Sequence, residues 1–188
     1  MRLHDSLDRL AVAKPDLDFA IQDVRHISYR QAAAEADRLA NAMIGAGLRG
    51  GDRVAVLAKN SIEYAVLYFA ASKAEVVLVP LNYRLAAPEW SFIVNDAEAK
   101  ALFAGQEYLT CLDTIRAELR TVSQFVCIDS EAPGWTSAGE WTSRQPAADA
   151  GRSEDANPEA VQMYTSGTTG KPKGVVLTHR SLISTSEV

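Results

Sequence analysis

The segment of this chain that is best equipped for chemistry is the polar loop at residues 164–175. Besides Tyr164 it contains four Ser or Thr hydroxyls, three glycines and two lysines, and apolar runs flank it on both sides. Glycines let backbone N–H groups approach a ligand closely, and successive N–H groups in such a turn form a concave site for anions. The hydroxyls and the ammonium group of Lys173 add further donors. This combination suits a polyphosphate.

Two other interpretations of the loop compete with phosphate binding. A Walker A loop requires G-x-x-x-x-G-K-[S/T] before a helix, whereas here Pro172 follows Lys171, Thr165 stands five residues before Gly170, and an apolar strand follows. That motif is therefore excluded. A polar hairpin turn without any ligand is the more common outcome for such a composition alone, so only the order of the residues can decide between the two.

The elements that must position this loop alternate along the chain. Compact apolar runs predict strands at 53–58, 76–79, 101–104, 125–128, 160–164 and 175–177. Helices are predicted at 28–45, 62–73, 88–96 and 106–119, with another starting near 180. A short helix and a hairpin at 19–27 precede them, and 130–157 is predicted to be an irregular connection with one helical turn. Strands that alternate with long helices indicate an α/β fold with a mostly parallel sheet.

Composition limits the classes of function. The chain has 188 residues and a net charge of −5, and no stretch concentrates Lys and Arg, which argues against nucleic-acid binding. No apolar run is long enough for a transmembrane segment. Asp5 and Asp8 near the N-terminus disfavour a secretory signal, so a cytoplasmic location is expected. Cys111 and Cys127 lack metal-ligand spacing and are interpreted as small buried residues in a reducing compartment.

The order of residues from Tyr164 to Val175, Tyr-Thr-Ser-Gly-Thr-Thr-Gly-Lys-Pro-Lys-Gly-Val, carries a resemblance to a known family. It resembles the phosphate-binding signature of the adenylate-forming, or AMP-binding, superfamily, which includes acyl-CoA synthetases, peptide-synthetase adenylation domains and beetle luciferases. Residues 28–31 with 38–40, 51–56 with 60–64, and 73–85 also resemble that superfamily, in the same order. The resemblance implies that residues 1–188 are the N-terminal portion of the large adenylate-forming domain. One departure is Glu75, where relatives usually carry Gly before a strand, so either Glu75 adopts a turn conformation that Gly takes easily or the turn differs slightly.

Within the superfamily, the segment Pro80–Leu85 and Thr168 favour an acyl-CoA synthetase over a peptide-synthetase adenylation domain. The implied reaction has two steps: a carboxylate attacks the α-phosphorus of ATP to give an acyl-adenylate and pyrophosphate, and the CoA thiolate then displaces AMP. Mg²⁺ and positive charge are needed because two anions must meet. The resemblance implies ATP-phosphate contacts from Thr165, Ser166, Gly167, Thr168, Thr169, Gly170 and Lys173, and makes Thr165 a candidate Mg²⁺ contact.

The resemblance also implies that this stretch contains no catalytic residue of its own. In relatives the adenine pocket, the ribose-binding Asp, the hinge and the C-terminal domain with the adenylation lysine all follow the loop. Residues 1–188 alone are therefore expected to be inactive and to associate with a copy or a partner through the uncovered surface. The expected ligands are a small carboxylic acid, ATP and CoA. A peptide-synthetase-like adenylation domain and a non-catalytic binding or assembly chain remain as alternatives.

Overall fold

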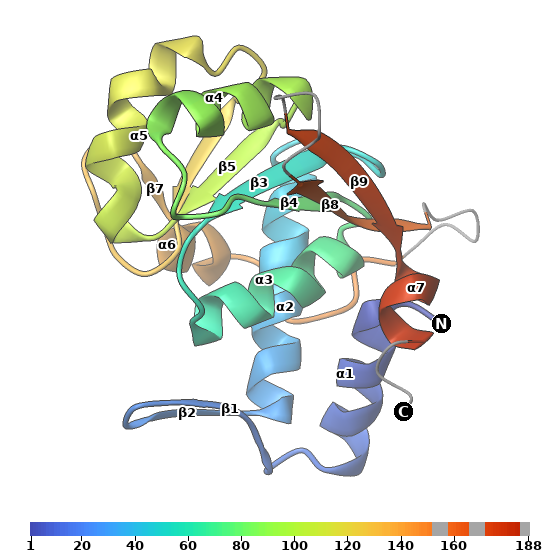
Figure 1. Ribbon diagram of the computed structural model, residues 1–188. Coiled ribbons are helices and arrows are strands. Elements are labelled where there is room, and N and C mark those ends of the chain that lie inside the picture. Colours follow the sequence, from blue (N-terminus) through green and yellow to red (C-terminus); the bar gives the residue numbers. More distant parts are fainter. Residues whose placement is uncertain (152–157, 166–171, 185–188) are drawn as a thin grey trace.

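The computed structural model describes residues 1–151, 158–165 and 172–184. In this part of the chain, a seven-stranded sheet has the order β7-β6-β5-β3-β4-β8-β9 (Figure 1). The strands are β3 (Arg53–Leu57), β4 (Val77–Pro80), β5 (Ala101–Ala104), β6 (Gln124–Cys127), β7 (Thr136–Ser137), β8 (Glu159–Thr165) and β9 (Lys173–Thr178). Neighbouring strands are parallel except β8 and β9, which pair antiparallel. The predicted α/β fold with a mostly parallel sheet is confirmed.

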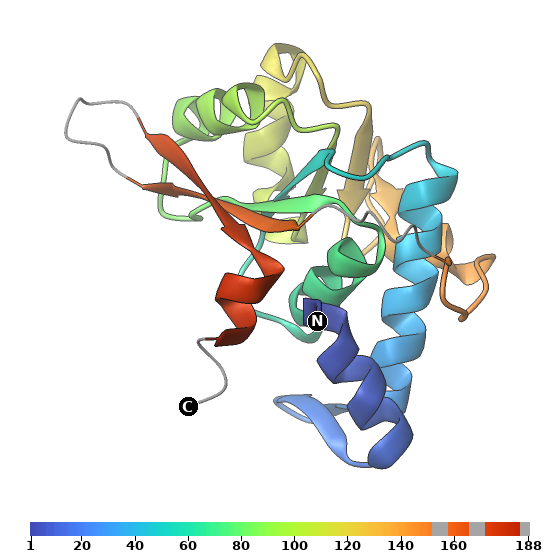
Figure 2. The same ribbon diagram turned by 90° about the vertical axis from the view of Figure 1, so that its right-hand side faces the viewer.

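Helices cover both faces of the sheet (Figures 1 and 2). One face carries α1 (Leu3–Ala13), α2 (Tyr29–Gly45), α3 (Ile62–Lys73), α6 (Ala138–Ser143) and α7 (His179–Ser184), and the other carries α4 (Ala87–Asp96) and α5 (Leu109–Ile115). Successive residues of β3 alternate between these layers: Val54 and Val56 pack under the first, and Ala55 and Leu57 under the second. A parallel strand that is buried on both faces reads as a continuous apolar run, which is why the sequence revealed it.

The helix starts follow from local hydrogen bonds that the sequence predicted. At α2, the Ser28 hydroxyl accepts a hydrogen bond from the Gln31 N–H at 3.3 Å, and the Ser28 N–H donates to the Gln31 side chain at 2.9 Å. At α3, the Ser61 hydroxyl accepts from the Tyr64 N–H at 3.1 Å. These side chains satisfy N–H groups that have no partner within the helix. A separate antiparallel hairpin, β1 (Asp18–Gln22) and β2 (Arg25–Ser28), leads into α2, as predicted.

The end of α2 depends on Gly47, which has φ = 93°. Replacing Gly47 by Ala is expected to lower the free energy of unfolding by roughly 1–2 kcal/mol, because a Cβ is unfavourable in the left-handed region. Gly45 is the matched control: it lies in the last turn of α2, and a Cβ there would meet nothing within 4 Å. Gly45→Ala should be neutral or stabilising. Urea unfolding midpoints measure both changes, and equal losses would contradict this account.

Glu75 adopts the left-handed conformation expected at a position where Gly would be easier, with φ = 56°. Its carboxylate forms an ion pair with Arg2 at 3.1 Å. That contact links the start of α1 to the turn before β4 and helps to offset the backbone strain.

A buried ion cluster joins α1, α2 and α3. The Lys73 ammonium lies 2.6 Å from a carboxylate oxygen of Asp8 and 2.8 Å from one of Asp37. The Lys73 side chain is only 4% exposed, and that of Asp37 is 14% exposed. These three helices therefore meet around one ammonium group.

Three local expectations are corrected by the structure. The continuous helix predicted at 106–119 is divided into a 3₁₀ turn, the seven-residue helix α5 and a second 3₁₀ turn. The connection at 130–157 contains the helical turn, as α6, but also the edge strand β7, and residues 152–157 lie outside the described part. Cys127 is buried as expected, whereas Cys111 is exposed, because it lies on the outer side of α5.

Candidate active site

The predicted phosphate loop connects the two strands of the β8–β9 hairpin. In the register of this pair, Thr165 stands opposite Lys173 and Tyr164 opposite Gly174. Residues directly opposite each other in an antiparallel pair share one face of the sheet. The hairpin therefore brings the Thr165 hydroxyl and the Lys173 ammonium to the same face, and both residues are exposed. The other predicted contacts, Ser166, Gly167, Thr168, Thr169 and Gly170, lie outside the described residues.

The two described residues of the predicted site supply a hydroxyl and a positive charge. Lys173 is exposed at the start of β9. The part of the chain that the structure describes contains no cluster of three His, Cys, Asp or Glu side chains that could hold a metal ion. A hydroxyl and an ammonium group are donors that fit the oxygens of an anion such as a phosphate.

The opposite face of the hairpin carries a chain of polar contacts that sequence reasoning missed. Arg53 donates to the Gln162 side-chain oxygen at 3.2 Å, and the Gln162 amide nitrogen donates to the Tyr164 hydroxyl at 3.0 Å. The Tyr164 hydroxyl in turn donates to Asp96 at 2.6 Å. Arg53 also forms an ion pair with Glu159 at 3.0 Å. The signal in the sequence that could have indicated these contacts is the polar residue Gln162 inside the apolar run of β8.

Gly174 is shaped by this contact chain. A Cβ on Gly174 would lie 2.5 Å from the Gln162 amide nitrogen and 3.1 Å from the Tyr164 ring carbon that bears the hydroxyl. The first distance is too short for any real side chain, so Gln162 would have to move. Gly174 thus makes room for two side chains of β8, in addition to any influence on the loop backbone.

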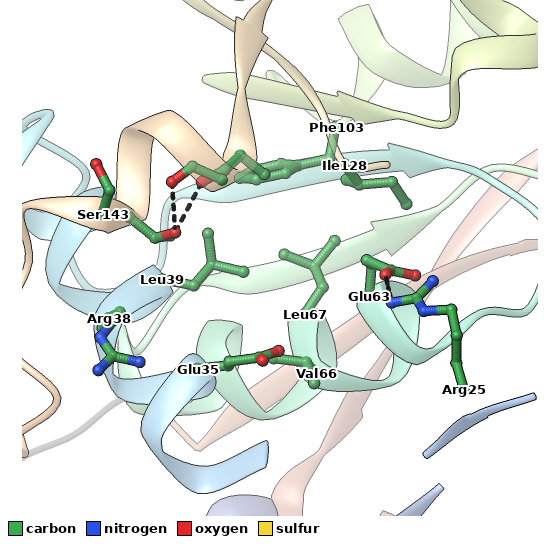
Figure 3. A pocket seen from close by; sticks show the side chains of 13 residues that line it. Arg25, Glu35, Arg38, Leu39, Glu63, Val66, Leu67, Phe103, Ile128 and Ser143 are labelled. Carbon is green, nitrogen blue, oxygen red and sulfur yellow. Dashed lines mark hydrogen bonds and ion pairs between the residues drawn. The ribbon is translucent and has the colours of Figure 1, made fainter. Parts of the chain in front are cut away.

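A pocket of about 490 Å³ lies elsewhere, between α2, α3 and α6 (Figure 3). Its floor includes the buried side chains of Leu67 and Phe103, and its rim carries Glu35 and the ion pair between Arg25 and Glu63. Burial and the neighbouring charge of Glu63 raise the pKa of the Glu35 carboxyl. The pocket shares no lining residue with the β8–β9 hairpin, and its lining combines two acidic side chains, Glu35 and Glu63, with two basic ones, Arg25 and Arg38.

Comparison with known families identifies the class of protein. The chain belongs to the AMP-binding enzyme family, whose sequence model matches residues 7–188. This confirms the resemblance seen in the sequence.

Particular relatives are ligases that act on carboxylic acids. Long-chain-fatty-acid–CoA ligase FadD13 of Mycobacterium tuberculosis is 40% identical over 184 residues, which cover 95% of this chain and 35% of that protein. The fatty acid–acyl-carrier-protein ligase ScoC of Streptomyces coeruleorubidus is 36% identical over 173 residues, covering 91% of this chain and 32% of ScoC. The chain thus spans about a third of the length of these curated relatives.

Solved structures agree with the fold. The inhibitor-bound N-terminal domain of FACL13 from Mycobacterium tuberculosis is similar with a TM-score of 0.87 at 35% identity, over 97% of this chain and 45% of that one. The anthranilate CoA ligase AuaEII, in complex with anthranoyl-AMP, gives a TM-score of 0.88 at 28% identity, over 96% of this chain and 35% of that one. Within the described residues, no helix has the length and apolar character that a membrane span requires.

Proposed function

We propose that the full-length protein is an acid–CoA ligase that uses ATP to activate a carboxylic acid and then transfers the acyl group to CoA. The observation that carries this proposal is the hairpin that sets Thr165 opposite Lys173 at the two ends of an AMP-binding signature. Membership in the AMP-binding enzyme family supports the chemistry, and the fatty-acid and anthranilate ligases among the similar proteins support the substrate class.

The proposed role of the hairpin is to hold the leaving group of the first step. When the carboxylate attacks the α-phosphorus, negative charge grows on the departing pyrophosphate. A positive charge and hydroxyl donors placed there in advance lower the barrier, because they do not have to reorganise during the reaction. Lys173 would supply the charge to the β- and γ-phosphates. Thr165 would offer its hydroxyl to the phosphates or to the Mg²⁺ that accompanies them.

An acyl carrier protein is a second candidate for the acyl acceptor. ScoC, which is 36% identical to this chain, is named as a ligase that loads an acyl carrier protein. The thiol of such a carrier could replace that of CoA without changing the adenylation step. We favour CoA because FadD13 and AuaEII are both CoA ligases.

A pyrophosphate-release assay tests the proposed function. With a panel of fatty and aryl acids, the full-length protein is expected to release pyrophosphate from MgATP only when a suitable acid is present, and to form a thioester only when CoA is added. Residues 1–188 alone are expected to give neither product, because they offer contacts to the phosphates only. Adenylation of amino acids without any CoA thioester would overturn the CoA-ligase assignment in favour of a peptide-synthetase type. Transfer to a carrier protein alone would favour the second acceptor.

A further inference from the structure

The end of β8 that leads into the phosphate loop shares little hydrogen-bonded register with the main sheet. The register between β4 and β8 consists of the single pair Leu78 and Val161. Beyond that point, β8 continues to Thr165 and pairs with β9 alone. Side-chain contacts between this end of the hairpin and the rest of the domain therefore add to the support that fixes Thr165 and Lys173.

The polar chain behind the hairpin has the geometry to supply this support. Arg53 can only donate, so the Gln162 oxygen has to face it and the Gln162 amide nitrogen has to face Tyr164. Tyr164 then accepts from Gln162 and donates to Asp96. Every donor therefore points from the guanidinium toward the carboxylate. Hydrogen bonds in such a chain polarise and strengthen one another. A reversed Gln162 amide would lose the bonds to both Arg53 and Tyr164.

The location of Asp96 points to the same role. Asp96 is the last residue of α4, where the helix dipole disfavours a negative charge. A short hydrogen bond from Tyr164 offsets that cost. Burial, together with the hydrogen bond and charge of Asp96, raises the pKa of the Tyr164 hydroxyl. Tyr164 therefore keeps its proton and remains a donor throughout the physiological pH range.

We propose that Tyr164 and Gln162 are positioning residues, which hold the β8–β9 hairpin against Arg53 and Asp96 so that Thr165 and Lys173 meet the ATP phosphates. This inference rests on the proposed adenylation function and deepens it. Gln162 and Tyr164 lie on the face of β8 opposite Thr165, so they act from behind and do not touch the nucleotide.

Half-reaction kinetics of the full-length protein test this role. Tyr164→Phe is expected to lower kcat/KM for MgATP in adenylation about tenfold, with a rise in KM, since a small misplacement of binding groups is costly. Thioester formation from preformed acyl-adenylate should be unchanged. Asp96→Ala should cause the same loss. The double variant Tyr164→Phe/Asp96→Ala should lose no more than either single variant. Asp96→Asn should retain most of the activity, because its amide oxygen still accepts from Tyr164. Tyr29→Phe, at the distant start of α2, is the control.

Amide hydrogen exchange supplies a readout that is independent of activity. In Tyr164→Phe, protection is expected to fall in β8 and β9 and to stay unchanged in β3 and β5. Gly174→Ala, which displaces Gln162, should have the same pattern. Equal loss in both half-reactions, or exchange that rises throughout the sheet, would show a merely structural role and overturn the inference. So would variants that match the wild type in both measurements.

The two proposals fail in distinguishable ways. A wild-type protein without acid-dependent pyrophosphate release would refute the proposed function, while the exchange experiment would still report whether the polar chain holds the hairpin. An active wild type with an unaffected Tyr164→Phe variant would refute only the positioning role.

Discussion

Replacing Lys173 by Ala in the full-length protein is expected to slow adenylation about 30- to 900-fold, which corresponds to roughly 2–4 kcal/mol of transition-state stabilisation. Lys173 stands at the start of β9, exposed and opposite Thr165. Its charge would act on the pyrophosphate group, which is present only in the first step. Formation of the thioester from preformed acyl-adenylate is therefore expected to be nearly unaffected. Single-turnover measurements of each step separate the two effects.

Two variants accompany this experiment. Lys173→Arg retains the charge and is expected to recover part of the adenylation rate, although its planar group does not place the charge at the same point. Lys14→Ala removes an exposed lysine at the end of α1, far along the chain from the loop, and should leave both steps unchanged. A Lys173→Ala protein that loses the same factor in both steps would show that Lys173 supports the fold, and the charge-based account would be wrong.

Replacing Lys73 by Met is expected to lower the free energy of unfolding by roughly 3–5 kcal/mol, because the substitution leaves buried carboxylate charge without a partner. Asp37 has a side chain that is only 14% exposed, and Asp8 lies beside it. The two acids would then repel each other between α1, α2 and α3. The midpoint of urea unfolding at neutral pH measures the loss.

The difference in unfolding free energy between the wild type and Lys73→Met should depend on pH in a definite direction. Burial disfavours the charged amine, but hydrogen bonds and charges from Asp37 and Asp8 outweigh that effect and raise the pKa of Lys73. A raised pKa in the folded state means that the stabilisation is fully present below the unfolded-state pKa and is lost as the pH rises through the folded-state value. The gap between wild type and Lys73→Met should therefore stay constant up to about pH 9 and narrow above about pH 10.4.

Lys59→Met is the matched control for this experiment. Lys59 forms an ion pair with Glu107 at 2.7 Å, but its side chain is 59% exposed. Water and salt screen such a pair, so its removal should leave the unfolding midpoint nearly unchanged. If Lys73→Met lowered the unfolding midpoint as little as Lys59→Met does, the buried cluster would not hold the three helices together.

The sequence was most informative where structure is determined locally. The helix 62–73 was predicted with its observed bounds, because Ser61 can cap its first turn. Buried strands such as β3 and β5 were visible as short apolar runs. The resemblance to AMP-binding enzymes was equally local, since it depends on the order of residues along the chain.

Tertiary contacts explain the misses. The predicted helix 106–119 is interrupted near Arg116, whose guanidinium lies 3.8 Å from the centre of the Phe125 ring and donates to the Gly134 carbonyl. Both partners are remote in sequence, so no local pattern predicts the break. Strand β7 has only two residues and therefore has no periodicity to detect. Its location depends on Trp135, which is buried and donates to Asp113.

The candidate site was predicted in part for the same reason. Residue types placed Thr165 and Lys173 in the loop, and the flanking apolar runs predicted the two strands. Their pairing, which sets the two residues opposite each other, appears only in the sheet. The contact chain behind them joins Gln162 to Arg53, more than a hundred residues earlier, and its one trace in the sequence is a polar residue inside the apolar run of β8.

The order of the strands in the sheet also leaves one strand edge uncovered for a time during synthesis on the ribosome. Strand β4 lies between β3 and β8, yet Leu78 of β4 and its partner Val161 of β8 are 83 positions apart (161 − 78). At about 5–20 residues per second, the nascent chain spends roughly 4–17 s with β4 as the outermost strand of a growing sheet. Val77, Leu78 and Val79, which are fully buried in the finished fold, then form an apolar edge that can pair with another nascent chain. Any pairing with another nascent chain is therefore expected in that interval, and at that edge.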